Sequence, residues 1–230
     1  MAHLLDNIFW NTLSGTHAHL STGTDTARRY APGFSPIVGF PDPLQPDFAA
    51  LLPFCEAGER FYCDAWSGPA PAGWRIEAES TMVRMIWDGV MPDADEAPDA
   101  IPLDASHAEQ ALALAVLTRP GPFGPRTIEL GEYFGYVEGG TLIAMAGERM
   151  AAPGLHEISG VCTHPDHQGR GYARRLMLKL IRRQLLRGET PFLHVMRANE
   201  AAHGLYLRMG FRDYCETVVR VVTPDARYVP

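Results

Sequence analysis

A glycine-punctuated turn between a strand pattern and a helix pattern constrains this chain more than any other feature. The turn is part of the segment Val161–Ala173, which reads VCTHPDHQGRGYA and whose apolar strand pattern ends at Pro165. Glycine lets backbone N–H groups approach a ligand closely, and the start of a helix offers unpaired N–H donors at the positive end of its dipole. The sequence therefore predicts an anion site at this turn, most naturally for a phosphate or a pyrophosphate.

Two other phosphate-binding motifs do not fit this turn. A Walker loop requires Gly-Lys-Ser/Thr, which the turn lacks. A dinucleotide fingerprint requires its glycines directly after the strand, but residues 164–167 intervene, and it requires a small residue where this chain has Arg174. The turn is therefore assigned to neither of these nucleotide-binding classes.

Composition and charge exclude several partners. The 230 residues carry a formal net charge of −7, whereas binding to nucleic-acid phosphates needs a basic surface. The sequence has no stretch of about 18 apolar residues and no basic and apolar N-terminal segments typical of a secretory signal. Its four cysteines show neither CxxC nor zinc-type spacing. We expect a cytoplasmic protein with free thiols and without a nucleic-acid or membrane partner.

The chain divides near residue 100 into two parts. In the first part, residues 47–55 have the apolar spacing of a helix, and residues 60–65 and 74–87 favour strands. Residues 88–104 alternate acidic residues with prolines and small residues, a composition typical of a linker that buries little. We therefore expect a smaller α+β domain over residues 1–100 and a second domain over residues 101–230.

The second part alternates regularly between helices and strands. A capping box and an Ala/Leu-rich body indicate its first helix, and a two-glycine turn indicates a hairpin after it. The expected elements run helix, three strands, helix, strand, helix and strand, over residues 106–118, 133–138, 141–146, 156–163, 168–187, 191–197, 199–209 and 214–222. This order predicts an α/β fold with a mixed sheet flanked by helices.

Two motifs around one expected strand resemble those of the GNAT superfamily of acyl-CoA-dependent N-acetyltransferases. Residues 168–173 (QGRGYA) match its Q/R-x-x-G-x-G/A pattern, and residues 199–211 (NEAAHGLYLRMGF) resemble its N-x(2)-A-x(3)-Y-x(3)-GF segment. The expected element order over residues 106–222 is also similar to that of the family. The resemblance implies a GNAT-type fold, acetyl-CoA as co-substrate, no metal, and direct attack of an amine on the thioester.

The resemblance also implies which residues hold CoA. The amides of the glycine turn would bind the pyrophosphate, and backbone groups of Val161 and Thr163 would pair with the pantetheine arm like an added strand. An N–H near Val161 or Cys162 would stabilise the oxyanion. Asn199 would hydrogen-bond the pantetheine, and it also fits a helix N-cap. The implied CoA-binding set is Val161, Cys162, Thr163, Gln168, Gly169, Arg170, Gly171, Tyr172, Ala173, Arg174, Asn199 and Tyr206.

Two side chains are the expected catalytic groups. By resemblance, Tyr206 would protonate the departing CoA thiolate, since a phenol donates without carrying a charge; core packing is its alternative role. Glu157 lies eleven residues before Gln168, where the histone-acetyltransferase branch of the superfamily carries its glutamate base. A carboxylate there could accept the proton of the attacking amine, whereas the alternative is an ordinary strand glutamate that faces solvent.

The sequence defines the acceptor side less sharply. The resemblance places the acceptor, a small-molecule amine or a peptide amine, between the first helices and the hairpin. Residues 1–100 would cap this pocket or form a degenerate copy of the same fold. A catalytically silent acyl-CoA-binding sensor is the alternative function. The aromatic residues expected at the acceptor are Phe123, Tyr133, Phe134 and Tyr136.

Three further features have ordinary structural interpretations. His164 and His167 flank a proline in a turn without further ligands at metal-binding spacing, so we interpret them as exposed turn histidines. Cys162 has no surrounding His/Asp pattern and fits a buried strand thiol. The bases of the long helix fit a solvated face, and only Arg174 and Arg175 lie close to the turn.

Overall fold

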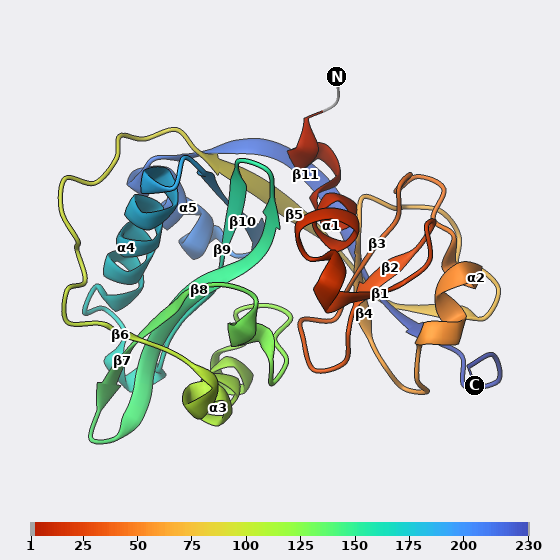
Figure 1. Cartoon of the computed structure of the whole chain (residues 1–230), viewed down its shortest axis with the longest axis horizontal. Coiled ribbons are helices and arrows are strands. Elements are labelled where there is room, and N and C mark those ends of the chain that lie inside the picture. The colour runs from red at the N-terminus through yellow and green to blue at the C-terminus, as the bar shows by residue number, and fades with distance from the viewer. Residues whose placement is uncertain (1–2, 230) are drawn as a thin grey trace.

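The computed structural model describes residues 3–229, and its second part contains the expected elements in the expected order. α4 and α5 cover one face of the sheet, and α3 covers the other (Figure 1). The elements are β6 (Ile101–Pro102), α3 (Ala108–Thr118), β7 (Tyr133–Glu138), β8 (Thr141–Ala152), β9 (Leu155–Thr163), α4 (Tyr172–Leu186), β10 (Thr190–Met196), α5 (Glu200–Met209) and β11 (Phe211–Pro224).

The first part contains short strands, two short α-helices and one long strand. Its elements are α1 (Ile8–Asn11), β1 (Ser21–Gly23), β2 (Arg28–Tyr30), β3 (Ile37–Gly39), α2 (Phe48–Leu51), β4 (Phe61–Asp64) and β5 (Trp74–Trp87). The expected strands at 60–65 and 74–87 are confirmed. The helix expected at 47–55 ends early and continues as a 3-10 turn, because Pro53 has no N–H for an α-helical hydrogen bond. Among residues 3–229, no helix is both long and apolar enough to span a membrane.

The eleven strands of the described residues form one sheet, in the order β1-β2-β3-β4-β11-β5-β10-β9-β8-β7-β6. β3 and β4 run parallel, as do β9 and β10, so the expected mixed sheet is confirmed. β5 from the first part lies between β10 and β11 from the second, and it pairs with β11 along its whole length. Figure 1 shows these two long strands crossing from one half of the molecule to the other. The boundary near residue 100 thus divides the sequence but not the sheet, and as a boundary between folding units it stays a prediction.

The middle of the segment 88–104 is held on α4. Ala97 is fully buried in the cluster that contains the inward side chains of α4. The Asp95 carboxylate accepts a hydrogen bond from Lys179 Nζ at 2.5 Å. Most of residues 88–104 is exposed, as expected of a segment that buries little, but contacts with α4 anchor its middle.

The basic side of α4 is largely in contact with solvent, as expected, except for Lys179, and ion pairs bridge several of its bases. Arg175 Nη2 lies 2.6 Å from Asp99 Oδ1, so this arginine is engaged away from the glycine turn. Arg183 and Arg187 both pair with Glu132, which precedes β7. The sequence could not show these pairs because their partners lie far away in the chain.

α4 begins four residues later than expected, at Tyr172 in place of Gln168. Gly169 and Gly171 have φ values of +75° and +80°, in the left-handed region that a right-handed helix excludes. The preceding residues Pro165–His167 form a 3-10 turn. The glycines therefore stand outside the helix and shape the loop that leads into it.

Candidate active site

The glycine turn presents a row of backbone amides without partners. The N–H groups from Gly169 to Ala173 donate no hydrogen bond within residues 3–229, and no side chain caps the start of α4. A Cβ placed on Gly169 or on Gly171 would meet no atom within 4 Å, so the space around both glycines is open. Unpaired amides at a helix start form an anion site, and their number and openness fit a pyrophosphate.

Side chains of the turn hold its shape or lie in solvent. Gln168 Nε2 donates to the carbonyl oxygen of Thr163 at 3.4 Å and so ties the turn to the end of β9. Tyr172 packs against Tyr136, with the two rings tilted and their centroids 4.6 Å apart. Arg174 is exposed at the start of α4, where a guanidinium could reach an anion held by the turn.

β9 and β10 separate just before this turn. They pair at only three positions, where Leu155–Glu157 lies opposite Thr190–Phe192. Beyond them, β9 remains paired with β8 as far as Thr163, and β10 remains paired with β5 as far as Met196. Within the described chain, the edge of β9 that faces β10 has no strand partner from Ile158 onward. Its backbone groups are free to pair with an extended ligand.

A β-bulge lies in this open part of β9. Gly160 and Val161 together lie opposite a single residue of β8, Ala146. Gly160 has a φ of +62°, which favours glycine. A bulge changes the direction of backbone groups, and this one lies where the oxyanion N–H was expected from the sequence.

Glu157 is fully buried and held by two side chains. Arg149 donates from Nε and Nη2 to the two carboxylate oxygens at 2.9 and 2.6 Å, and His194 Nδ1 lies 2.7 Å from Oε1. Burial alone would raise the pKa of Glu157, but Arg149 and His194 outweigh burial and lower the pKa to about 2. The carboxylate is therefore ionised at neutral pH and is not the solvent-facing strand glutamate of the alternative interpretation.

The hydrogen bonds of His194 fix its tautomer. Arg84 Nε lies 3.0 Å from His194 Nε2, and since a guanidinium only donates, Nε2 must accept and carry no proton. The proton is therefore on Nδ1 and points at Glu157. Burial lowers the pKa of His194 below its usual value, which keeps the ring neutral. Arg84 also pairs with Asp64 of β4, so two arginines and two carboxylates balance around one neutral imidazole.

The two motif residues that follow β10 lie at the start of α5 and within it. Asn199 Oδ1 accepts a hydrogen bond from the amide of Ala202 at 3.2 Å, so the N-cap interpretation is confirmed. Tyr206 packs beside Phe211 with ring centroids 6.2 Å apart, and its hydroxyl has no hydrogen-bond partner within residues 3–229. Burial raises the pKa of Tyr206 to about 12, so the phenol keeps its proton at neutral pH.

The four expected acceptor residues lie on two faces of the sheet. Phe123 and Tyr133 contact each other on the α3 side, with ring centroids 6.1 Å apart. Phe134 and Tyr136 face α4, where Arg183 lies over the ring of Phe134. The structure therefore does not bring the four together into one wall, and only Phe123 and Tyr133 border the bulge.

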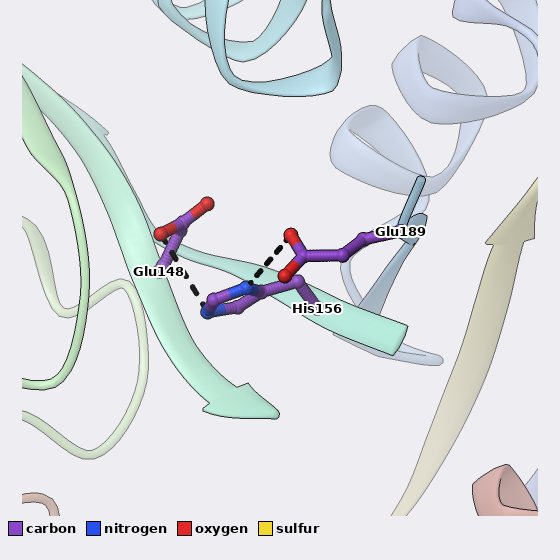
Figure 2. Close-up of side chains that lie close together, drawn as sticks. All are labelled: Glu148, His156 and Glu189. Carbon is purple, nitrogen blue, oxygen red and sulfur yellow. Dashed lines mark hydrogen bonds and ion pairs between the residues drawn. The ribbon is translucent and has the colours of Figure 1, made fainter. Parts of the chain in front are cut away.

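A carboxylate–imidazole cluster lies near the point where β9 and β10 meet (Figure 2). The His156 ring lies between Glu148, at 3.5 Å, and Glu189, at 3.2 Å. Their potential ligand atoms are close enough for a metal ion. However, the Arg187 guanidinium donates to Glu148 and to Glu189, so a cation already pairs with both carboxylates. The cluster is explained as an ion-pair network without a metal.

Cys162 lies near the end of β9, and His164 and His167 follow that strand. His164 and His167 are partly buried and not exposed, because they line a cavity of about 370 Å³ with Glu138. His167 Nδ1 lies 3.2 Å from Glu138 Oε2. Cys162 is a buried thiol as expected, and burial raises its pKa to about 11.

Known proteins are similar to this chain in sequence and in fold. The family described as FR47-like protein matches residues 133–221. A putative acetyltransferase from the GNAT family of Novosphingobium aromaticivorans is 33% identical. The alignment covers 97% of this chain and 100% of that one, with a TM-score of 0.88. The chain belongs to the GNAT family. The GNAT membership and GNAT-type fold expected from the sequence are thereby confirmed.

Other GNAT proteins match with lower identity or over a shorter segment. A GCN5-related N-acetyltransferase-like protein from Streptococcus suis is 18% identical, covers 93% of this chain and 92% of its own, and has a TM-score of 0.59, which shows the shared fold. The N-alpha-acetyltransferase RimI of Mycobacterium tuberculosis is 37% identical over 83 residues, or 35% of this chain. The match spans 51% of that curated relative, about half its length.

Proposed function

We propose that this GNAT protein transfers an acetyl group from acetyl-CoA to a primary amine by direct attack in a ternary complex. The observation that carries the proposal is the placement of the free amides of Gly169–Ala173 beside the unpaired edge of β9. The amides would hold the pyrophosphate, and the edge would pair with the pantetheine amides as an added strand. Free thiols at all four cysteines are compatible with the cytoplasmic location that we also propose.

The remaining chemistry would come from groups around the bulge. An N–H near Val161 or Cys162 would stabilise the oxyanion, and Tyr206 would give its proton to the leaving thiolate. Glu157 is the proposed base. Since its pKa of about 2 makes it a weak acceptor, it would take the proton only after the nitrogen has bonded to the carbonyl carbon and become acidic.

The proposed acceptor is the α-amino group of a peptide or a small primary amine. The match to an N-alpha-acetyltransferase makes peptide N-termini the first acceptors to test. A cavity of about 280 Å³ between Tyr62 of β4 and the end of α3 offers a route, and Phe123 lies in its wall. We propose that residues 101–230 carry the chemistry and that residues 1–100 form one side of this entrance.

The ion pair of Glu157 with Arg149 favours one second candidate, a silent acyl-CoA-binding sensor, because it leaves no strongly basic carboxylate. Titration calorimetry with acetyl-CoA, combined with a thiol-release assay over a panel of amines and peptides, separates the two. The enzyme binds acetyl-CoA and releases CoA only when an acceptor is present. A sensor binds acetyl-CoA and releases no CoA with any acceptor.

Replacing Tyr206 by phenylalanine is expected to lower kcat by about 100-fold, the lower range for loss of a general acid. The ring and its contact with Phe211 are kept, so the dissociation constant of acetyl-CoA should remain unchanged. Since the pKa of Tyr206 is about 12, the wild-type rate should show no alkaline loss from this group below about pH 11. A Tyr206→Phe variant with wild-type kcat would remove the hydroxyl from the mechanism.

A further inference from the structure

Tyr133 at the start of β7 carries a buried hydroxyl without a partner. The residue is only 2% exposed, and its hydroxyl makes no hydrogen bond within residues 3–229. Buried polar groups are almost always hydrogen-bonded, since desolvation without a partner is unfavourable. An unpaired hydroxyl in this position therefore points to a partner that arrives with the reactants.

Gly147 and Gly160 leave the space that the Tyr133 ring occupies. A Cβ on Gly147 of β8 would lie 2.2 Å from the ring carbons, so no other residue leaves room for the ring there. A Cβ on Gly160 would lie 3.1 Å from Cε1 and 3.2 Å from the hydroxyl oxygen. The hydroxyl thus lies on the bulge of β9, where the strand edge that faces β10 is open.

The hydroxyl is suited to donate a hydrogen bond without ionising. Burial, the largest effect, raises the pKa of Tyr133 well above its usual value, and nearby Glu157 acts in the same direction against Arg149. The phenol therefore stays neutral over the working range of pH. A neutral donor that is held rigidly by packing can meet a developing negative charge without rearrangement.

Phe123 links this hydroxyl to the entrance between the two halves of the molecule. One side of Phe123 lies on the bulge, with Cε2 at 3.3 Å from a Cβ placed on Gly160. Phe123 also lines the cavity of about 280 Å³ that Tyr62 and Arg119 border. An acceptor that enters through the cavity would pass Phe123 and reach Tyr133 at the bulge.

We propose that Tyr133 is a catalytic residue that donates a second hydrogen bond to the oxyanion, beside the backbone amide of β9. The inference rests on the proposed acetyl transfer. As the amine nitrogen bonds to the carbonyl carbon, the C=O π pair moves onto oxygen, and the Tyr133 hydroxyl donates to that oxygen while keeping its proton. The electron pair on oxygen then re-forms the C=O double bond as the C–S bond breaks. The departing thiolate takes a proton from Tyr206, and the nitrogen gives its proton to the base.

Tyr133→Phe removes only the hydroxyl and tests this role. Because the bond strengthens as charge develops, we expect kcat to fall by about 100- to 1,000-fold with both KM values within about twofold of wild type. The urea midpoint of unfolding should stay equal or rise, because the variant buries one fewer unpaired polar atom.

Tyr30→Phe is the matched control. The Tyr30 hydroxyl is equally buried but bonded, to His17 Nδ1 at 2.8 Å and to the carbonyl oxygen of Arg149 at 3.2 Å. Its loss should lower the urea midpoint and leave kcat within about threefold of wild type. The two variants should therefore show opposite patterns of activity and stability.

Amine-dependent thiol release by the wild-type protein is measured first. If the wild type is active and Tyr133→Phe keeps its kcat, or raises only the KM of the amine, the oxyanion role of Tyr133 is overturned while acetyl transfer stands. If the wild type releases no CoA with any acceptor, acetyl transfer itself fails and the inference fails with it. A fall in kcat with an unchanged or higher urea midpoint supports the inference.

Discussion

Replacing Gly169 by aspartate is expected to weaken binding of acetyl-CoA by at least about 100-fold, or about 2.8 kcal/mol at 1.4 kcal/mol per factor of ten. The substitution places a carboxylate among the free amides of the turn, where it would repel a pyrophosphate and compete for the same donors. Bringing like charges together in a binding site costs several kcal/mol. The open space around Gly169 accommodates the side chain, so the effect should come from its charge and not from a clash.

Gly169→Asn is the matched control for this charge. Asparagine has nearly the same shape as aspartate, and both residues tolerate the left-handed conformation, here a φ of +75°, better than most. We expect the asparagine variant to bind acetyl-CoA within about tenfold of wild type by titration calorimetry. Equal affinities of the aspartate and asparagine variants would show that the pyrophosphate lies elsewhere.

Glu157→Gln is expected to lower the free energy of unfolding by about 3–5 kcal/mol, the range found when one partner of a buried ion pair is removed. The variant leaves the Arg149 guanidinium buried without a counter-charge, and it also disturbs the hydrogen bond from His194. Urea unfolding measures the loss. Glu56→Gln, an exchange at an exposed loop glutamate, should change the free energy by less than about 0.5 kcal/mol.

The stability difference between wild type and Glu157→Gln should depend on pH in a defined direction. The pKa of Glu157 is about 2 in the folded protein, below its usual value. The stabilisation of the folded protein by the ionised Glu157 carboxylate is therefore complete above about pH 4.3, the pKa of glutamate in the unfolded chain. This stabilisation is lost as the pH falls toward 2. Unfolding curves at several pH values should show the difference shrink on acidification. A difference that is small at neutral pH or grows in acid would contradict the ion-pair description.

Local sequence patterns predicted the positions of most elements in the second part of the chain. The capping residues, the two-glycine hairpin turn and the apolar periodicity act over a few residues, so α3, β7, β9, β10 and α5 begin within two residues of their expected starts. α4 starts four residues later than expected because Gly169 and Gly171 adopt left-handed φ values, which the sequence pattern does not distinguish from a helix start. Asn199 could be assigned as an N-cap because capping is also local.

Contacts between distant segments could not be derived from the sequence. The partners of Glu157 come from β8 and β10, and those of His194 come from β5 as well. One signal was available: Glu148 and Arg149 interrupt an otherwise apolar run over Thr141–Ala152, which indicates two buried charges that each need a partner elsewhere in the chain.

The order of the strands in the sheet also could not be predicted from local sequence patterns. The insertion of β5 between β10 and β11 joins residues that are more than 100 positions apart, so local patterns could not connect the first part of the chain with His194 and Glu157. Through Arg84 of β5 and Asp64 of β4, this part reaches His194 and so contributes to the surroundings of Glu157.

Thiol release from acetyl-CoA in the presence of defined acceptors tests the proposed acetyl transfer most directly. The wild-type protein should release CoA at a rate that rises with and saturates in the concentration of at least one peptide or small amine, with the acetylated amine as the second product. At a limiting concentration of acetyl-CoA, the rate of CoA release should fall strongly in the Gly169→Asp variant. The Gly169→Asn variant should still release CoA. Tight binding of acetyl-CoA without acceptor-dependent release from any member of the panel would contradict acetyl transfer.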